Sequence, residues 1–371
     1  MTDELRVDGR VTVYRLHDIG YAIALDHAAE LLGTAPTSRV RPARLEARAI
    51  EIRNPPISVP LRSFDLTVDH GICSASVSAH LFDFGVCSLQ VQVQAPNGLG
   101  WSSFAEFGAA VERAPDLKSV FDETLGTITQ RVAAAIERPA VAPLAEDYRV
   151  YRIDAIRGGS AVAVSRKLSD EQLVSLLIGE RRQLSNEARR ELIPHRFSYY
   201  DDDLVVLTWE SALVVEPRAD DRDVEHILEF ANAQLLELRM YDLQLDAALP
   251  ALYDRVEATR ARRRPRLASR FRAVLSDLQT RVADVTETIE RVENSLKVTN
   301  DVYLARIYAA ALELFRERAW RSGIERKLTI LRETYAMLNS EAQSARAELL
   351  EIAIVVLIVA ELVLGLLRHS S

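Results

Sequence analysis

Residues 72–95 read ICSASVSAHLFDFGVCSLQVQVQA and carry a strong local signal for β structure. Apolar and polar residues alternate over Ile72–Phe82 and again over Val86–Ala95, which is the period-two pattern of a β-strand. The tripeptide Asp83-Phe84-Gly85 separates the two runs, and a glycine in a short connection is typical of a hairpin turn. This stretch therefore predicts an antiparallel hairpin.

A second set of the same signals follows this hairpin along the chain. The sequence Val150-Tyr151-Arg152-Ile153 echoes Val13-Tyr14-Arg15-Leu16, which precedes the first hairpin. Helical spacing at Asp170–Glu180 comes next, and a second hairpin is indicated by Phe197–Tyr200 with Leu204–Glu216. We interpret the pattern as two diverged copies of a strand–helix–hairpin unit, whose sheets pair or pack together with helices on one face.

The predicted fold class is α+β, with an N-terminal head, a helical or coiled-coil stalk and a C-terminal transmembrane helix. From Asp223 onward the sequence carries almost only helix signals. The predicted boundaries are 1–138 for the first α+β unit, 146–220 for the second, 223–348 for the stalk and 349–367 for the transmembrane anchor.

Within the stalk, residues 267–300 show the spacing of a coiled coil. Apolar residues recur there at alternating intervals of four and three, which places them along one seam of a helix. Such a seam indicates self-association, so we expect a homo-oligomer. The predicted seam consists of Leu275, Leu278, Val282, Val285, Ile289, Val292 and Leu296.

The C-terminal run IAIVVLIVAELVLGLL, residues 352–367, predicts a tail anchor in a lipid bilayer. Twelve of its 16 residues are Leu, Ile or Val, although as a helix it spans only about 24 Å against a hydrocarbon core of roughly 30 Å. A buried helix in the core of an oligomer is the alternative. The predicted anchor residues are Leu350, Glu351, Ile352, Val355, Ile358, Glu361, Leu362 and Leu366.

The N-terminus has no apolar segment of the kind that a secretory signal contains. Together with the predicted tail anchor, this indicates a single-pass protein of the cytoplasmic membrane, with its N-terminal bulk in the cytoplasm. The formal net charge of −8 excludes a polyanion-binding surface over the whole molecule, and two cysteines are too few for a disulfide framework.

An arginine-rich stretch is the best candidate for binding an anionic partner. It combines a local excess of positive charge with a proline, as in a connection between two helices, and its partner is RNA, the ribosome or lipid headgroups. A solvated helix connection without any partner is the other interpretation. The candidate residues are Arg260, Arg262, Arg263, Arg264, Arg266 and Arg270.

Catalytic signals are weak. The chain has no phosphate-binding glycine motif, and it lacks the short zinc-protease and serine-hydrolase motifs. Asp201-Asp202-Asp203 resembles a site for a hard divalent cation, but aspartates are also common in turns. We therefore expect no enzyme, no metal, no cofactor and no small-molecule substrate.

The C-terminal residues 326–367 resemble the required-for-meiotic-nuclear-division family, also called domain of unknown function 155. The resemblance is carried by a leucine-patterned helix, by Leu350-Glu351 before the apolar run, and by Glu361-Leu362-Val363 within it. It departs from the family at Ile352, where an aromatic residue is usual. The resemblance implies a bacterial-type member that is attached to a membrane through its tail, and it transfers no catalytic residue.

Two functions follow from these expectations. The first is a non-enzymatic, tail-anchored scaffold that self-associates through its stalk and presents the head to the cytoplasm. The alternative is a factor that tethers RNA or ribosomes and supports translation at the membrane. A metal-dependent enzyme that uses Asp201–Asp203 is the third and weakest hypothesis.

Overall fold

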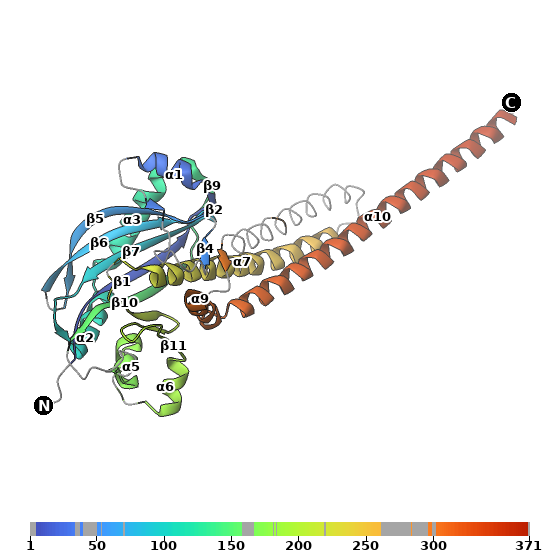
Figure 1. The fold of residues 1–371 in the computed structure, drawn as a ribbon. Coiled ribbons are helices and arrows are strands. Elements are labelled where there is room, and N and C mark those ends of the chain that lie inside the picture. The colour runs from blue at the N-terminus through green and yellow to red at the C-terminus, as the bar shows by residue number, and fades with distance from the viewer. Residues whose placement is uncertain are drawn as a thin grey trace. The chain divides into compact units, whose positions relative to one another are not determined.

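The computed structural model describes residues 5–33, 38–39, 50–52, 54–69, 71–157, 167–180, 182, 184–218, 220–260, 283, 296–298 and 302–369 (Figure 1). The chain forms two compact units. The first contains residues 1–240 and 290–318, and the second contains residues 241–289 and 319–371.

A large sheet of ten strands forms the centre of the first unit (Figure 1). Its strands lie side by side in the order β11 (His195–Phe197), β12 (Leu204–Leu207), β13 (Ser211–Val215), β10 (Ala145–Arg157), β1 (Arg6–Asp18), β7 (Val86–Gln94), β6 (Gly71–Leu81), β5 (Ile57–Val68) and β3 (Ser38–Arg39), and β8 (Leu99–Gly100) also pairs with β1. Two smaller pairs join β2 (Gly20–Ile23) to β9 (Ile136–Pro139) and β4 (Ile50–Ile52) to β14 (Leu296–Val298).

Strands β6 and β7 form the hairpin that the sequence predicts, with Leu81 opposite Cys87. Gly85 in the turn has φ +98°, and a Cβ atom there would lie 1.8 Å from the carbonyl oxygen of Gly20. Both its backbone conformation and its surroundings therefore require glycine. The second predicted hairpin differs, because Leu204–Glu216 is two strands, β12 and β13, that pair with each other.

The expected α+β class is wrong, because the structure is a mixed α/β fold around one large sheet. The two predicted units of the head both contribute strands to this sheet, and β1 pairs with β10 at its centre. Strand β10 also runs parallel to β13, although most of the other neighbours in the sheet are antiparallel. The boundaries at residues 138 and 146 stay predictions.

Helices cover both faces of the sheet. On one face, α1 (Leu25–Leu32), α2 (Trp101–Glu112), α3 (Leu117–Arg131) and α5 (Asp170–Ile178) pack on a hydrophobic core. Helix α5 begins in a capping box, in which the Ser169 hydroxyl accepts from the Gln172 backbone N–H, and α6 (Asn186–Leu192) follows it. On the other face lie the first turns of α7 (Asp223–Arg260) and α9 (Val302–Leu314).

The described residues of the second unit form helices, and the predicted boundaries of the stalk at residues 223 and 348 stay predictions. The second unit contains α7 from residue 241 and most of α10 (Glu317–His369). The Lys327 ammonium donates to Asp242 Oδ1 at 2.6 Å and lies 2.6 Å from Asp246 Oδ1, which joins the two helices. Leu245 on α7 and Ile324 on α10 are also buried.

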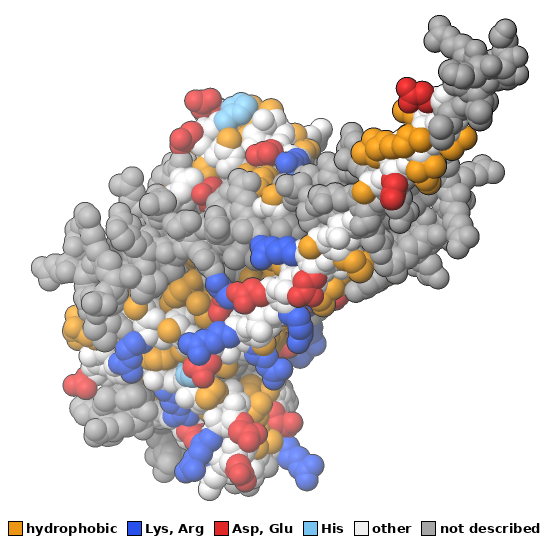
Figure 2. Space-filling view, turned by 90° about the vertical axis from the view of Figure 1, so that its right-hand side faces the viewer, with side chains coloured by type: hydrophobic (Ala, Val, Ile, Leu, Met, Phe, Trp, Pro, Cys, Tyr) orange, Lys and Arg blue, Asp and Glu red, His pale blue; other side chains and the backbone are white. Residues whose placement is uncertain are grey.

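The C-terminal part of α10 carries the predicted membrane anchor, and hydrophobic side chains gather on it (Figure 2). Leu350, Ile352, Val355 and Ile358 are each more than half exposed. Glu351 and Glu361 are also exposed, whereas the side chains of Leu362 and Leu366 lie outside the described residues.

No helix within the described residues has the length and the apolar character needed to cross a bilayer. The predicted transmembrane anchor and the single-pass location in the cytoplasmic membrane are therefore wrong. The physical reason is that the apolar run is short for a hydrocarbon core of roughly 30 Å, and that acidic residues stand at Glu351 and within it at Glu361.

Candidate functional site

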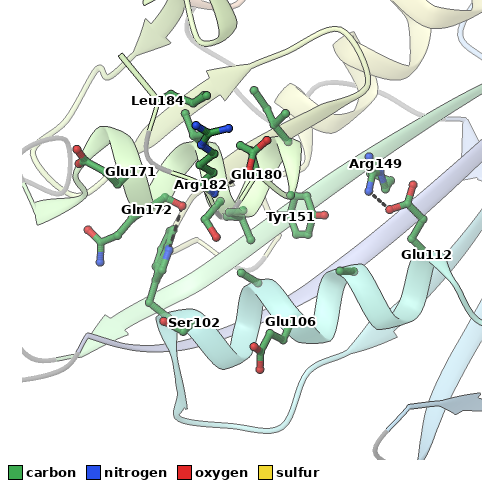
Figure 3. A pocket seen from close by; sticks show the side chains of 18 of the residues that line it. Ser102, Glu106, Glu112, Arg149, Tyr151, Glu171, Gln172, Glu180, Arg182 and Leu184 are labelled. Atoms are coloured by element: carbon green, nitrogen blue, oxygen red, sulfur yellow. Dashed lines mark hydrogen bonds and ion pairs between the residues drawn. The ribbon is translucent and has the colours of Figure 1, made fainter. Parts of the chain in front are cut away.

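A cavity of about 820 Å³ opens between α2 and α5 on the face of the sheet that carries the hydrophobic core (Figure 3). Strand β10 contributes Arg149 and Tyr151 to its lining. Further side chains come from α2, and from α5, α6 and the residues between them, among them Glu106, Glu112, Glu171, Glu180, Arg182, Leu184 and Arg189. Four arginines and five glutamates line the cavity, so both signs of charge meet there.

Close packing between α2 and β10 shapes the cavity. A Cβ atom at Gly108 would lie 2.2 Å from Cε1 of Tyr151, so α2 reaches this position only because residue 108 is glycine. The ring of Tyr151 also packs edge-on against Phe104, and burial raises the pKa of its hydroxyl. At the first turn of α2, the indole N–H of Trp101 donates to the backbone carbonyl of Gln172 at 3.2 Å and links α2 to α5.

Two arginines in the lining are largely buried and paired with carboxylates. Arg149 is 15% exposed, forms an ion pair with Glu112, and lies 3.9 Å from Glu210. Arg189 is 13% exposed and pairs with Glu171, whose pKa is lowered by a backbone hydrogen bond and by this arginine. These pairs neutralise much of the charge that the lining carries.

Some donors in the cavity are not used by the protein. The Nε–H group of Arg189 is buried and has no hydrogen-bond partner among the described residues. Arg182, an exposed residue between α5 and α6, forms no ion pair with any side chain that the structure describes. Leaving a buried N–H of a charged guanidinium without a hydrogen-bond acceptor costs free energy. An anion bound in the cavity can supply that acceptor.

The opposite face of the sheet carries a buried polar layer beneath α7. His80 on β6 and Glu229 on α7 are only 3% and 2% exposed, and their Nδ1 and Oε2 atoms lie 2.7 Å apart. Gln90 donates to the other carboxylate oxygen of Glu229 at 2.8 Å. Burial raises the pKa of Glu229, but the charge and hydrogen bond of His80 outweigh burial, so this pKa is lowered.

Arg152 forms a second polar cluster on this face. It is 0% exposed, and its guanidinium pairs with Asp154 at 2.9 Å and with Glu225 at 3.0 Å. It also donates to backbone carbonyls in the segment that leads into α7, those of Glu216, Arg218 and Asp221. The cluster therefore fastens the start of α7 to the centre of the sheet.

The aspartate cluster does not form a metal site in the described structure. Asp203 Oδ1 accepts from the backbone N–H groups of Tyr199 at 2.7 Å and Tyr200 at 3.1 Å, which is how a turn aspartate is used. Asp201 and Asp202 are exposed. Among the described residues no group of three or more His, Cys, Asp or Glu side chains is placed to hold a metal ion.

The other predicted sites fall largely on residues that the structure does not describe. Arg260 ends α7, and its side chain lies outside the described residues, as do Arg262, Arg263, Arg264, Arg266 and Arg270. Leu296 is in β14, opposite Ile52, while Leu275, Leu278, Val282, Val285, Ile289 and Val292 lie outside the described residues. The homo-oligomer and the RNA or ribosome partner stay predictions.

Sequence reasoning missed both the cavity and the polar layer. The residues that line the cavity come from segments far apart in the chain, so no local spacing in the sequence marks the cavity. A signal for the polar layer was present: Glu225 and Glu229 stand four residues apart in the first turns of a predicted helix, with the apolar residues Ile227 and Leu228 between them. Two acidic residues on one helical face indicate polar partners across the interface.

Comparison with known proteins identifies the first unit. A family model described as "Uncharacterized protein MJ0711, N-terminal domain" matches residues 8–221. The "Uncharacterized protein MJ0711" of Methanocaldococcus jannaschii is 24% identical over 196 residues, or 53% of this chain and 59% of the relative. The chain thus matches less than two thirds of that relative's length. No solved structure matches the chain.

The resemblance to the required-for-meiotic-nuclear-division family is wrong, because the family match lies in the head and identifies a different family. The residues that suggested it belong to α10. A leucine pattern followed by an apolar run is shared by many long helices, so these features did not distinguish one family from another.

Proposed function

The chain belongs to the family of the MJ0711 N-terminal domain, and we propose that this domain binds a small organic anion in the cavity between α2 and α5. The observation that carries the proposal is the buried, unsatisfied Nε–H of Arg189 in the lining of that cavity. This proposal replaces the expectation that the protein has no small-molecule ligand, and with it the tail-anchored scaffold, which fails for lack of a membrane-spanning helix among the described residues.

The charges of the cavity favour an anion at one end. Arg189 offers Nε–H, and Arg182 offers a guanidinium with no ion pair among the described residues. A carboxylate or phosphate that reaches either of these groups receives charge-assisted hydrogen bonds, which are about twice as strong as neutral ones. The guanidinium plane also suits the geometry of such oxyanions.

The remainder of the lining selects for a small ligand with an apolar part. The cavity volume of about 820 Å³ lies in the range of small-molecule sites, roughly 300–1,000 Å³. Trp101, Leu176 and Ile178 supply apolar surface. The glutamates of the lining repel a polyanion that fills the whole cavity, so a compact anion fits better than a nucleic acid.

Titration calorimetry on the full-length protein tests this proposal. The probes are inorganic phosphate, citrate and benzoate, which combine one or more negative charges with different apolar content. At least one probe is expected to bind, and Arg189→Ala is expected to weaken its Kd at least tenfold, equal to about 1.4 kcal/mol. Arg190→Ala is the matched control, because Arg190 is the next residue of α6, is exposed, and does not line the cavity.

Two results contradict the proposal. One is the absence of binding for all three probes at millimolar concentration with folded protein. The other is equal binding by the wild type, Arg189→Ala and Arg190→Ala, which places any bound anion elsewhere. Arg182→Ala tests where in the cavity the anion binds. Loss of the Arg182 side chain weakens binding only if the ligand reaches the segment between α5 and α6.

A further inference from the structure

Three side chains on the α7 face of the sheet form a continuous chain of hydrogen bonds. Ser58 on β5 lies opposite His80 on β6 in the register of the sheet. Its hydroxyl oxygen is 3.0 Å from His80 Nε2, and His80 Nδ1 is 2.7 Å from Glu229 Oε2. The order is therefore hydroxyl, imidazole and carboxylate.

The carboxylate favours one tautomer of the imidazole. An ionised carboxylate only accepts hydrogen bonds, so a proton on Nδ1 of His80 is donated to Glu229, while the amide nitrogen of Gln90, itself a donor, lies 2.7 Å from the same Nδ1. In neutral imidazole this leaves Nε2 as an acceptor for the hydroxyl of Ser58. Gln90 holds the second oxygen of Glu229, so the carboxylate is fixed on both sides.

Exposure follows the same order along this chain of bonds. Ser58 is partly exposed, whereas His80 and Glu229 are buried. The hydroxyl is thus the end of the chain that solvent and a substrate reach, and the base and its carboxylate are shielded from water. A nucleophile next to an oriented base is the arrangement that serine-dependent acyl transfer requires.

We propose that Ser58, His80 and Glu229 form a serine-nucleophile site that hydrolyses small carboxylic esters. This site is separate from the anion cavity, which lies on the opposite face of the sheet, and it replaces the expectation that the protein is not an enzyme. The substrate class is an ester with a small acyl group, because the nucleophile is a single partly buried hydroxyl on a strand.

The reaction is balanced in two steps. Ser58 Oγ attacks the ester carbonyl carbon and passes its proton to His80 Nε2, and the bond to the alkoxy oxygen breaks as that oxygen takes the proton and leaves as an alcohol. A water molecule then attacks the acyl-serine, His80 again accepts and returns a proton, and the carboxylic acid leaves with the serine restored. Glu229 is a positioning residue, since it acts through His80.

Covalent labelling of the full-length protein with a fluorophosphonate is the first test. Attack by Ser58 forms an Oγ–P bond and releases fluoride, so peptide mass spectrometry is expected to find the adduct on Ser58. Ser58→Ala removes the adduct. Ser78→Ala is the matched control and keeps it, because Ser78 is a partly exposed serine two residues from His80 on β6.

Hydrolysis of p-nitrophenyl acetate is the second test. Ser58→Ala is expected to lower kcat at least a hundredfold, and Ser78→Ala by less than twofold. Glu229→Gln is expected to lower kcat and to change the pH profile of kcat/KM, which a purely structural carboxylate does not do. Circular dichroism confirms that each variant is folded, and Glu229→Asp tests rescue by a retained carboxylate.

The proposal is overturned if wild-type protein gives no adduct on Ser58. It is also overturned if Ser58→Ala hydrolyses the ester at the wild-type rate, or if the adduct forms on other serines with equal yield. An unchanged pH profile in folded Glu229→Gln removes Glu229 from the site. None of these results bears on anion binding between α2 and α5, so the serine site and the anion site can each be disproved without the other.

Discussion

The two faces of the central sheet have opposite chemistry, although they are built from the same strands. On β1, Val11 and Val13 point into the hydrophobic core beneath α2 and α3, whereas Arg10 and Tyr14 face α7. The first face is stabilised by burial of apolar side chains, and this effect is non-directional, so it does not depend on any one paired group. The second is held by hydrogen bonds and ion pairs, and each of these fails if one partner is lost.

This difference teaches where each face is sensitive. An apolar interface loses free energy in proportion to the volume removed or added, because its energy is spread over many contacts. A buried polar layer concentrates its energy in a few groups such as Arg152 and Glu229. A single substitution in the polar layer is therefore expected to have a larger effect than one of similar size in the apolar core.

The largest effect is expected for Arg152→Met. This change removes the guanidinium and leaves Glu225 buried with its main partner missing, so the free energy of unfolding is expected to fall by about 3–5 kcal/mol. Urea unfolding followed by circular dichroism measures it. Arg157→Met, in the exposed end of the same strand, is the control and changes stability by less than about 1 kcal/mol. Equal losses of unfolding free energy in the two variants contradict the expectation that the buried polar layer is more sensitive than the exposed end of the strand.

Gly108→Ala tests the apolar face. The added Cβ collides with the Tyr151 ring, so the free energy of unfolding is expected to fall by about 1–3 kcal/mol. The control is Gly126→Ala in α3, where nothing lies within 4 Å of a new Cβ. Because alanine is the better helix former, this control is expected to gain about 0.5–1 kcal/mol. The prediction fails if both variants shift stability in the same direction.

His226 makes the polar face sensitive to acid. Burial, and then the charges of His80 and Arg222, lower its pKa to about 3, while Glu229 opposes this shift. The unfolded chain binds a proton below about pH 6.5, and the folded chain does not do so until about pH 3. Stability is therefore lost as the pH falls through this window. The loss is expected to be at most ~1.4 kcal/mol per pH unit.

Unfolding measured at pH 7 and pH 5 checks this expectation, with His226→Gln as the variant. The variant is expected to lose less stability than the wild type between pH 7 and pH 5, because it lacks the contribution of His226. Burial raises the pKa of Asp18 to about 6, which acts in the opposite sense as it titrates, but Asp18 is present in both proteins and cancels. His27→Gln, an exposed position in α1, serves as the control. An unchanged difference in His226→Gln contradicts the assignment.

The smallest effect is expected at the rim of the apolar face. Arg62 on β5 and Glu123 on α3 form an ion pair at 3.3 Å, and their side chains are 51% and 67% exposed. Arg62→Ala is therefore expected to change the free energy of unfolding by no more than about 1 kcal/mol. A double-mutant cycle with Glu123→Ala measures the coupling energy of the pair. A coupling energy above about 2 kcal/mol contradicts the expectation that exposed ion pairs contribute less than buried ones.

Sequence patterns predicted the parts of the fold that are decided locally. The hairpin of β6 and β7 was predictable because its alternation is long and its turn contains Gly85. The division between β12 and β13 was not, because the apolar residues resume directly after Thr208-Trp209-Glu210 and give the appearance of one strand. The Thr208 hydroxyl accepts from the backbone N–H of Ser211 and closes that turn, which is a contact rather than a pattern.

The candidate sites depended on tertiary contacts and were therefore not predictable. The alternating His80, Ser88 and Gln90 indicate a solvent-facing side of a hairpin, and only the placement of α7 shows that this side is buried. The two largely buried arginines of the cavity, Arg149 and Arg189, come from β10 and α6, which are not adjacent in the sequence. Glu361 lies within the apolar run of α10, and a charged side chain there disfavours a membrane-spanning helix.

The pairing of β1 with β10 also sets the order of events while the chain is being synthesised. Strand β1 is complete within the first 18 residues, but its hydrogen-bonding partner is far along the chain, since Arg15 and Asp147 are 132 residues apart. At roughly 5–20 residues per second, one edge of β1 remains unpaired for about 7–26 seconds after the strand is made. Strand β7, once it has been made, covers only the other edge. A newly made chain thus presents a long unpaired strand edge, and this edge is where aggregation and the binding of a chaperone are expected to begin.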